Sequence, residues 1–346
     1  MNNLFYHVYP SYYKQFSCLM GECRHSCCIG WEIDIDEHSL ARYDAMEGAL
    51  GERIRNAIDR DGTPHFRLTE DERCPFLNGG GLCDLILSCG EDALCHICKC
   101  HPRFFNFAGK YVETGLGMAC EGAARLILLS KEPMTLVIEE APNRVYKPRF
   151  TSLKKRGELI ALLQDRTRSI DERILACKSY IGASFGIELS EWIDSFIDLE
   201  QMDPEWTALL HRLKRTAPLI DFSALDRCME GREYEYEQLL VYFAYRYLSR
   251  WKSGESFSET FLVIELLYRL YRGLAAMRLS ETGAFTEEDA VFLLRMLSAE
   301  IEYSDENMMT LEEMIGFQVL LRRDLFSDES VLDAEPAPPS GIDKII

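Results

Sequence analysis

Cysteine is the residue type with the most chemistry to offer in this chain, and its thirteen copies are unevenly distributed. Four fall within residues 18–28, and seven more follow before residue 121. The rest of the chain holds only Cys177 and Cys228, which lie in helical patterns and are assigned to the core. Thiolates bind zinc, iron–sulfur clusters and copper(I), so the N-terminal concentration predicts a metal- or cluster-binding region.

The N-terminal sequence favours reduced thiols over a disulfide framework. It has no cationic start followed by an apolar run, so no secretory signal is predicted. The most apolar window, 261–277, is broken by three charged residues, and no membrane span is predicted. We therefore expect a cytoplasmic protein, where a cysteine cluster is more often metal-binding or catalytic than disulfide-bonded.

The adjacent pair Cys27 and Cys28 bears on the kind of metal centre. If residues 22–28 are helical, Cys23 and Cys27 share a face, and Cys28 points roughly 100° away from Cys27. One tetrahedral site would not use both neighbours, so either one is spare or they serve separate parts of a larger constellation. Zinc closes at four ligands, fewer than the thiols available here, which favours an iron–sulfur cluster and leaves zinc as the alternative. The Cys95-x-x-Cys98 spacing is a weak signal by itself.

Two differently built regions must position these thiols. Alternation over 33–36 predicts a short strand, after which Asp36 caps a helix over 37–58. Short strands and loops are expected over 65–120, followed by a helix over 121–129. Prolines then mark a connector, and we place a boundary near residue 145.

Beyond the connector, apolar residues recur at helical spacing. Capping-box pairs support three helix starts: Ser256 with Glu259, Thr286 with Asp289, and Thr310 with Glu313. The sequence predicts a mainly α protein, with an irregular Cys-rich metal- or cluster-binding region with short strands (1–145) docked on an α-helical body (146–330), then a mobile tail (331–346). The predicted helices are 152–182, 188–200, 204–214, 233–252, 257–279, 286–302 and 310–326.

Charge and composition exclude some partners. The net charge of -19 argues against binding to nucleic acid or to an anionic membrane, because both attract lysine- and arginine-rich surfaces. The chain carries no G-x-G-x-x-G after a strand and no G-x4-G-K-[ST], so neither usual phosphate-binding loop is predicted.

Several motifs together resemble the flagellin lysine-N-methylase family, of the Cys-rich zinc- or iron-chelating type. They are the run from Cys18 to Trp31, Cys74-Pro75-Phe76-Leu77, Gly81-Leu82-Cys83, and Cys98 with Pro102-Arg103 and Cys120. In the C-terminal half, Tyr242–Tyr247 and Tyr303–Asn307 extend the resemblance.

The resemblance implies transfer of methyl groups from S-adenosylmethionine to lysines of flagellin, with a [4Fe–4S]-type cluster on the thiols. A lysine must lose its proton before it attacks, so a base or a tyrosine-lined channel is expected. Tyr242, Tyr245, Asp305 and Glu306 are the candidates for that role. Cys89, Cys95 and Cys100 fall outside the family pattern. The implied metal ligands are Cys18, Cys23, Cys27, Cys28, Cys74, Cys83, Cys98 and Cys120.

Two other classes of function remain open from the sequence. In one, zinc or a cluster only stabilises an irregular region, and the helices bind a partner without catalysis. In the other, the protein transfers electrons or senses redox state through the potential of its cluster.

Overall fold

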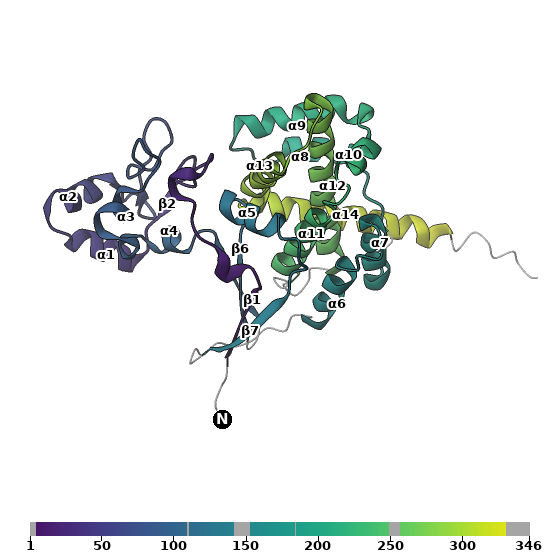
Figure 1. Ribbon diagram of the computed structural model, residues 1–346, viewed down its shortest axis with the longest axis horizontal. Helices are drawn as coiled ribbons and strands as arrows, with labels where there is room; N and C mark the ends of the chain where they lie inside the picture. The colour runs from purple at the N-terminus through teal and green to yellow at the C-terminus, as the bar shows by residue number, and fades with distance from the viewer. Residues whose placement is uncertain (1–4, 109–110, 142–152, 184, 249–256, 330–346) are drawn as a thin grey trace, which may run out of the picture.

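The computed structural model describes residues 5–108, 111–141, 153–183, 185–248 and 257–329. Figure 1 shows two unequal parts, a small lobe that carries the first helices and a large helical body. A sheet of strands lies at the lower side of the body in this view. The predicted class, a mainly helical protein with a Cys-rich region of short strands, is confirmed.

The small lobe is built from very short elements around a core of its own. Its three two-residue strands pair in the order β2-β4-β3. The core holds Ile33, Tyr43, Ile54, Phe66 and Phe76, together with the buried thiols of Cys74 and Cys95. The elements are β2 (Ile33–Asp34), α1 (Glu37–Ala45), α2 (Gly48–Ala57), β3 (Ile58–Asp59), β4 (His65–Phe66), α3 (Asp84–Cys89) and α4 (His96–Cys100).

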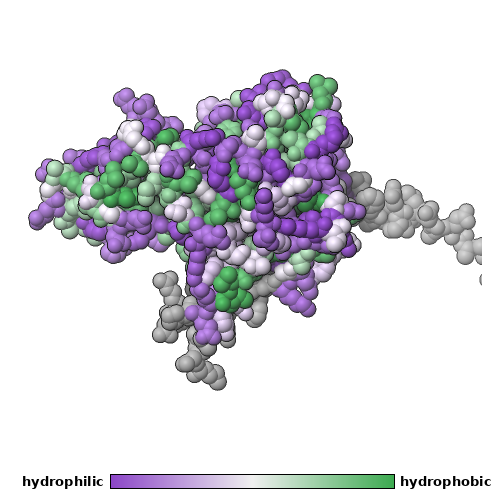
Figure 2. All heavy atoms as spheres, in the orientation of Figure 1, coloured by the Kyte–Doolittle hydropathy of each residue, from purple (hydrophilic) through white to green (hydrophobic). Residues whose placement is uncertain are grey.

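A four-stranded sheet connects the lobe to the body. Its strands are β1 (Phe5–Pro10), β5 (Arg103–Ala108), β6 (Tyr111–Leu116) and β7 (Leu136–Ala141), in the order β5-β6-β1-β7. The first strand runs parallel to β6 and antiparallel to β7. The chain leaves this sheet after β1 and returns at β5, so the whole small lobe is an insertion between two strands of one sheet. Figure 2 shows an apolar patch over the edge strand β7, where Leu136 and Ile138 are 38% and 60% exposed.

The helical body is organised around α11 (Tyr234–Tyr247), in which all residues but the first are buried, and α12 (Phe257–Thr282), which is buried along most of its length. Helices that are buried on nearly all sides lie in the centre of a large core. The surrounding helices are α5 (Glu121–Leu128), α6 (Leu153–Leu163), α7 (Ile170–Ile181), α8 (Ile193–Asp198), α9 (Pro204–Thr216), α10 (Phe222–Cys228), α13 (Glu287–Leu297) and α14 (Asp305–Glu329).

Three predicted helix limits are wrong. The helix expected over 37–58 is two helices, because the chain turns at Met46 and Gly48 has a φ of 80°. The helix expected over 152–182 also divides, since Ser169 starts α7 with a capping box of its own. Thr310 caps nothing, because α14 already begins at Asp305.

Other predictions are confirmed or lie outside the described residues. The strand at Ile33, the cap at Asp36 and the capping box of Thr286 with Asp289 are all present. Ser256, the boundary near residue 145 and the tail over 331–346 lie outside the residues that the structure describes.

Replacing Asp36 by alanine is expected to destabilise the small lobe by about 1 kcal/mol at neutral pH. The carboxylate accepts from the backbone N–H of Ser39 at 2.9 Å and of His96 at 2.8 Å, so it caps α1 and ties α4 to it. Burial opposes ionisation of Asp36, but these hydrogen bonds prevail and lower its pKa to about 2.

The lowered pKa gives this contribution a pH dependence. Because the folded-state pKa lies below the ordinary value of 3.8, the contribution is present above pH 4 and is lost as the pH falls toward 2. Urea denaturation of the wild type and the variant at pH 7 and at pH 2 measures it, with exposed Asp34→Ala as the matched control. Equal effects of the two substitutions would contradict the cap.

Candidate functional site

One group of thiols lies where the small lobe meets the body. Cys120 occupies the position before the first turn of α5, and the next residue, Glu121, accepts from the backbone N–H of Arg24 at 2.8 Å. The side chain of Leu19 lies so close to Gly122 that an added Cβ would stand 3.2 Å from it. These contacts hold the 18–27 loop against α5, so Cys18, Cys23 and Cys27 are brought to the same place as Cys120.

A second group of thiols surrounds the core of the small lobe. The backbone N–H of Cys74 donates to the carbonyl of Cys28 at 2.8 Å, and Leu77 forms an isolated bridge with Cys83. Cys28, Cys83 and Cys98 are partly buried against the core that contains Cys74. Four of the predicted ligands are therefore gathered in the small lobe.

Cysteines begin three of the short helices, where serine or aspartate is the usual residue. Cys83, Cys95 and Cys120 precede the first turns of α3, α4 and α5. Burial raises the pKa of the Cys83 thiol, and the backbone N–H groups of Ile86 and Leu85 oppose that rise. Burial likewise raises the pKa of Cys120, against the N–H groups of Ala123 and Gly122. Such N–H groups favour the thiolate, which is the form that binds metal.

The donor set fits a thiophilic metal centre, although it is not closed around one point. In the described part of the chain, no three His, Cys, Asp or Glu side chains are arranged to hold an ion. The eight predicted thiols nevertheless come together from segments far apart in sequence, and the Cys27 thiol donates a hydrogen bond to Cys28, which links the two groups. Soft sulfur donors suit zinc or an iron–sulfur cluster. Their role as ligands therefore stays a proposal.

The three thiols outside the predicted set differ in their surroundings. Cys95 is fully buried, and the thiol of Cys98 donates to it, which lowers the pKa of Cys95 to about 7. Cys89 is exposed at the end of α3, and Cys100 lies 3.6 Å from Nε2 of His96. The sequence prediction left Cys95 out of the metal-ligand set together with Cys89 and Cys100, although the C-x-x-C spacing of Cys95 and Cys98 indicated that these two thiols lie close together.

The four candidate catalytic residues do not form one site, because the two tyrosines are buried and the two carboxylates are exposed. Tyr245 is buried, and its hydroxyl donates to the carbonyls of Val8 and Thr114 at 3.1 and 3.0 Å, so it fastens α11 to the sheet. Tyr242 is buried beside the sheet end, where it receives a hydrogen bond from the N–H of Met118 at 3.3 Å. Asp305 and Glu306 are exposed in the first turn of α14.

Tyr242 instead belongs to a buried polar cluster that the sequence did not reveal. Glu302 accepts from the hydroxyls of Tyr242 and Tyr247 at 2.9 and 2.7 Å and pairs with Arg246 at 3.2 Å. Burial raises the pKa of both phenols, so they stay protonated and act as donors rather than bases. The sequence held only a weak signal for this cluster. Arg246 lies within one of the two motifs that carried the C-terminal resemblance, and Glu302 lies directly before the other.

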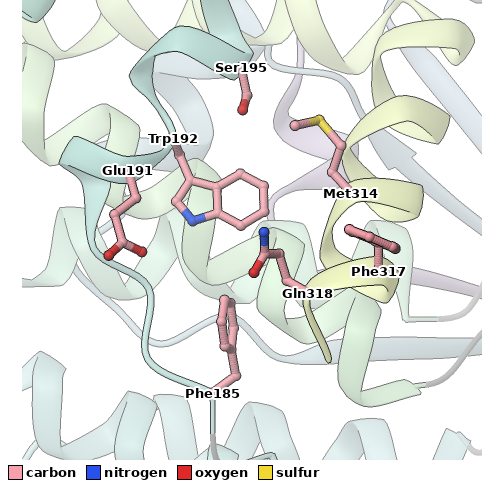
Figure 3. Close-up of a pocket in the computed structure, with 7 residues that line it drawn as sticks. All are labelled: Phe185, Glu191, Trp192, Ser195, Met314, Phe317 and Gln318. Carbon is pink, nitrogen blue, oxygen red and sulfur yellow. The ribbon is translucent and has the colours of Figure 1, made fainter. Parts of the chain in front are cut away.

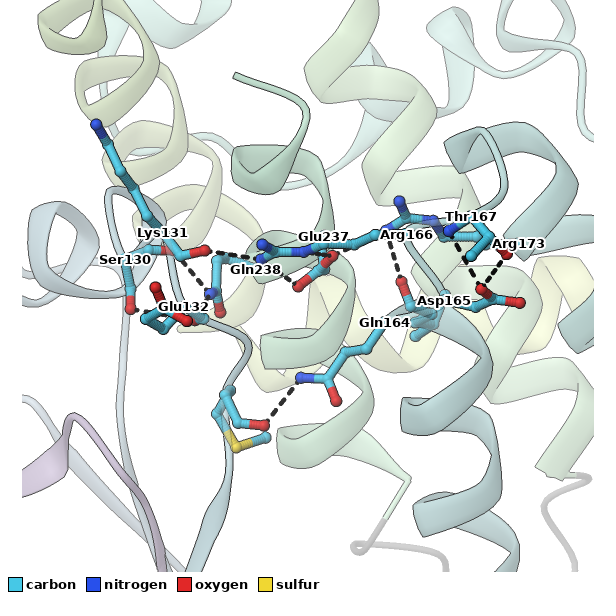
Figure 4. A network of polar contacts seen from close by, with 12 residues as sticks. Ser130, Lys131, Glu132, Gln164, Asp165, Arg166, Thr167, Arg173, Glu237 and Gln238 are labelled. Carbon is cyan, nitrogen blue, oxygen red and sulfur yellow. Dashed lines mark hydrogen bonds and ion pairs between the residues drawn. The ribbon is translucent and has the colours of Figure 1, made fainter. Parts of the chain in front are cut away.

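A cavity of about 730 Å³ opens in the body between the α6–α7 loop, the start of α11 and α12. Glu237 lies at its wall and binds Arg166 through both carboxylate oxygens at 2.9 Å and Arg173 at 2.9 Å, as Figure 4 shows. The hydroxyl of Tyr236 is buried there without a hydrogen-bond partner among the described residues. The volume of this cavity lies within the range of about 300–1,000 Å³ that small-molecule sites occupy.

A second cavity, of about 130 Å³, lies between Trp192 and α14. Figure 3 shows the indole of Trp192 between Phe185 and the side chains of Met314 and Phe317. This space is too small for a nucleotide-sized cofactor.

Comparison with known proteins gives matches over part of the chain. Residues 188–322 match the model of the FliB lysine N-methylase C-terminal domain. A lysine-N-methylase of Salmonella typhimurium is 26% identical over 164 residues, which are 44% of this chain and 40% of that protein. The flagellar biosynthetic protein FliU of Salmonella muenchen is 27% identical over 134 residues, which are 37% of this chain and 79% of that protein.

The match spans about 40% of the length of the two lysine-N-methylases, the second being from Salmonella choleraesuis. No solved structure matches the chain. Within the described residues, no helix is both long enough and apolar enough to span a bilayer.

Proposed function

We propose that this protein methylates lysine side chains and that flagellin is its substrate, because residues 188–322 match the model of the FliB lysine N-methylase C-terminal domain. That match is the observation on which the proposal depends. The names of the relatives, two lysine-N-methylases and one flagellar biosynthetic protein, support both parts of it. We place the reaction in the cytoplasm, where the many thiols would stay reduced.

S-adenosylmethionine is the proposed methyl donor, and it would supply an electrophilic methyl group. We propose the cavity beside Glu237 as its site. The donor carries a sulfonium, an ammonium, a carboxylate and a flat base, and the cavity offers charges of both signs with aromatic rings. Support comes from its volume and from its lining, which includes Arg166, Arg168, Arg173, Arg272, Asp171, Asp226, Glu233, Tyr234, Tyr236 and Tyr268.

A [4Fe–4S]-type cluster on the eight thiols is the proposed metal group, with zinc as the alternative. The thiols would hold it, and it would at least stabilise the region around them. Its donor set is entirely sulfur, which both groups accept.

Of the four candidate catalytic residues, the exposed pair is the one that a protein substrate can reach. A lysine ammonium approaching α14 would meet the carboxylates of Asp305 and Glu306. We propose that they attract the substrate lysine. Tyr242 and Tyr245 then hold the scaffold beneath, because their hydroxyls are already engaged in the core.

Incubating anaerobically purified protein with S-adenosylmethionine and flagellin should add methyl-sized mass steps to flagellin lysines. The double variant Asp305→Asn/Glu306→Gln should lower kcat/KM by about tenfold, because two carboxylates that steer a cation are lost. Glu37→Gln/Glu52→Gln removes two exposed charges from the small lobe and serves as the control. Peptide mass spectrometry measures the transfer.

Two negative results would contradict different parts of the proposal. Absence of methyl transfer by metal-loaded protein would overturn the proposed activity. Equal rates in the two double variants would overturn only the role given to Asp305 and Glu306.

A further inference from the structure

We infer that the cavity beside Glu237 holds S-adenosylmethionine in one orientation, with the adenine base at its buried tyrosine end and the amino-acid part at its charged rim. This orientation rests on the methyl donor and the cavity proposed above. It makes Tyr236 and Glu233 the residues that select the ligand, one at each end.

Burial divides the cavity into two ends. The inner end includes Met229, Tyr236 and Tyr268, which are 1%, 3% and 1% exposed. The rim includes Arg168 and Glu233, which are both exposed. A flat and largely apolar base is favoured against the inner end, whereas fully charged groups are favoured at the rim, where water still solvates them.

The inner end is held in place by its own packing. The rings of Tyr236 and Tyr268 meet edge to face, with centroids 5.7 Å apart and planes at 84°. The guanidinium of Arg272 lies 5.9 Å from the centre of the Tyr236 ring. A wall that is already ordered loses little conformational freedom when a ligand binds, so more of the contact energy appears as affinity.

Two hydrogen-bond donors at this end have no partner among the described residues. They are the hydroxyl of Tyr236 and Nε of Arg272, on residues that are only 3% and 7% exposed. A buried donor without an acceptor costs free energy, so a ligand that brings acceptors is favoured there. The ring nitrogens of adenine are such acceptors, and the ammonium of the amino-acid part is not.

The carboxylate of the methyl donor is a poorer match for the inner end. Arg272 already pairs there with Asp171 and Asp226. A third carboxylate would have to leave water and lie near those two, which is unfavourable for a buried charge. The uncharged base meets no such penalty.

Glu233 is the carboxylate that remains available at the rim. It stands before the first turn of α11, where its side chain makes no capping hydrogen bond. Within the part of the chain that the structure describes, it has no ion-pair partner, whereas Asp171 and Asp226 are both paired with Arg272. The ammonium of the amino-acid part therefore lies beside Glu233.

The rim also leaves one arginine for the carboxylate of the methyl donor. Arg166 and Arg173 are both bound by Glu237, as Figure 4 shows. Arg168 pairs only with Asp165, at 3.2 Å and at the surface. The sulfonium joins the two parts of the donor, so its methyl group lies toward the rim, where the lysine of another protein can reach it.

Calorimetric titration of the full chain, purified anaerobically, tests this orientation with S-adenosylhomocysteine and adenosine as probes. Tyr236→Phe should weaken the binding of both probes about tenfold, because a hydrogen bond to the base is lost. Glu233→Gln should weaken the binding of S-adenosylhomocysteine about threefold and leave adenosine unchanged, because adenosine carries no ammonium.

Tyr271→Phe is the matched control. Its hydroxyl is also buried without a partner among the residues described, but Tyr271 does not line the cavity, so neither probe should bind differently. Thermal denaturation followed by circular dichroism checks the fold of each variant. Neither tyrosine substitution should lower Tm, because each removes a hydroxyl that makes no hydrogen bond.

The orientation would be wrong if Tyr236→Phe bound both probes as the wild type does, or if Glu233→Gln weakened adenosine as much as S-adenosylhomocysteine. A wild type that binds neither probe would overturn it together with the proposed cavity, even if the protein methylates flagellin. Binding as expected in a protein that transfers no methyl group would leave the orientation intact and overturn the proposed activity alone.

Discussion

Replacing Arg156 by alanine is expected to lower the free energy of unfolding by about 3–5 kcal/mol. Its guanidinium on α6 bonds both carboxylate oxygens of Glu113 on β6, at 2.9 and 2.5 Å. The two side chains are only 3% and 1% exposed. Without Arg156 the Glu113 carboxylate would lie buried with no opposite charge beside it, which is the costly part of breaking such a pair.

The same guanidinium also donates to the carbonyl of Tyr245 at 3.2 Å, so it connects α6, the sheet and α11. Urea denaturation followed by circular dichroism measures the change. Lys14→Ala breaks the ion pair of Lys14 with Glu139, whose side chains are 61% and 48% exposed, and should cost far less stability because solvent screens such a pair. If the two variants lost similar stability, Arg156 and Glu113 would not form a buried pair in solution.

If the thiols hold the proposed metal, removing it with a chelator is expected to unfold the small lobe and leave the helical body folded. The lobe depends on a core of ten buried side chains, strands of two residues, and an α4 of only five residues. Elements this short have little stability of their own. Structural zinc contributes about 10–16 kcal/mol of binding free energy to comparable small units.

Hydrogen exchange followed by mass spectrometry should show this division. After chelation, amides over 33–100 should lose their protection, whereas those of α11 and α12 should keep it because their helices lie in the main core. Restoring the metal should restore the protection. Unchanged exchange in the lobe after complete metal removal would contradict the expectation.

The long helices of the body could be predicted because their apolar periodicity and caps agree, as at Thr286 and Asp289. Where prediction failed, the local pattern did not carry the information. Apolar residues continue at helical spacing from Leu40 through Leu50, so the turn before Gly48 was hidden. The helix α14 begins after Ser304, whose hydroxyl accepts from the N–H of Asn307 at 3.2 Å, six residues before the cap that the sequence favoured.

The candidate site was likewise predictable only in part. Spacing along the chain singled out the cysteines as candidate ligands, because closely spaced thiols are a local signal. It could not show which thiols meet, since Cys120 reaches the 18–27 loop through the fold alone. The bond between Glu302 and Tyr242 likewise joins residues 60 positions apart, and no local pattern predicts it.

The place of β1 in the sheet sets an order of events during synthesis. This strand is made first, yet its partners are residues 111–113 of β6 and 136–141 of β7. At about 5–20 residues per second, translation leaves β1 without those partners for on the order of ten seconds. In that interval residues 33–100 of the small lobe are all synthesised, and they hold a core of their own. The lobe can therefore fold while the ribosome is still adding the strands that will pair with β1 and the body that follows them.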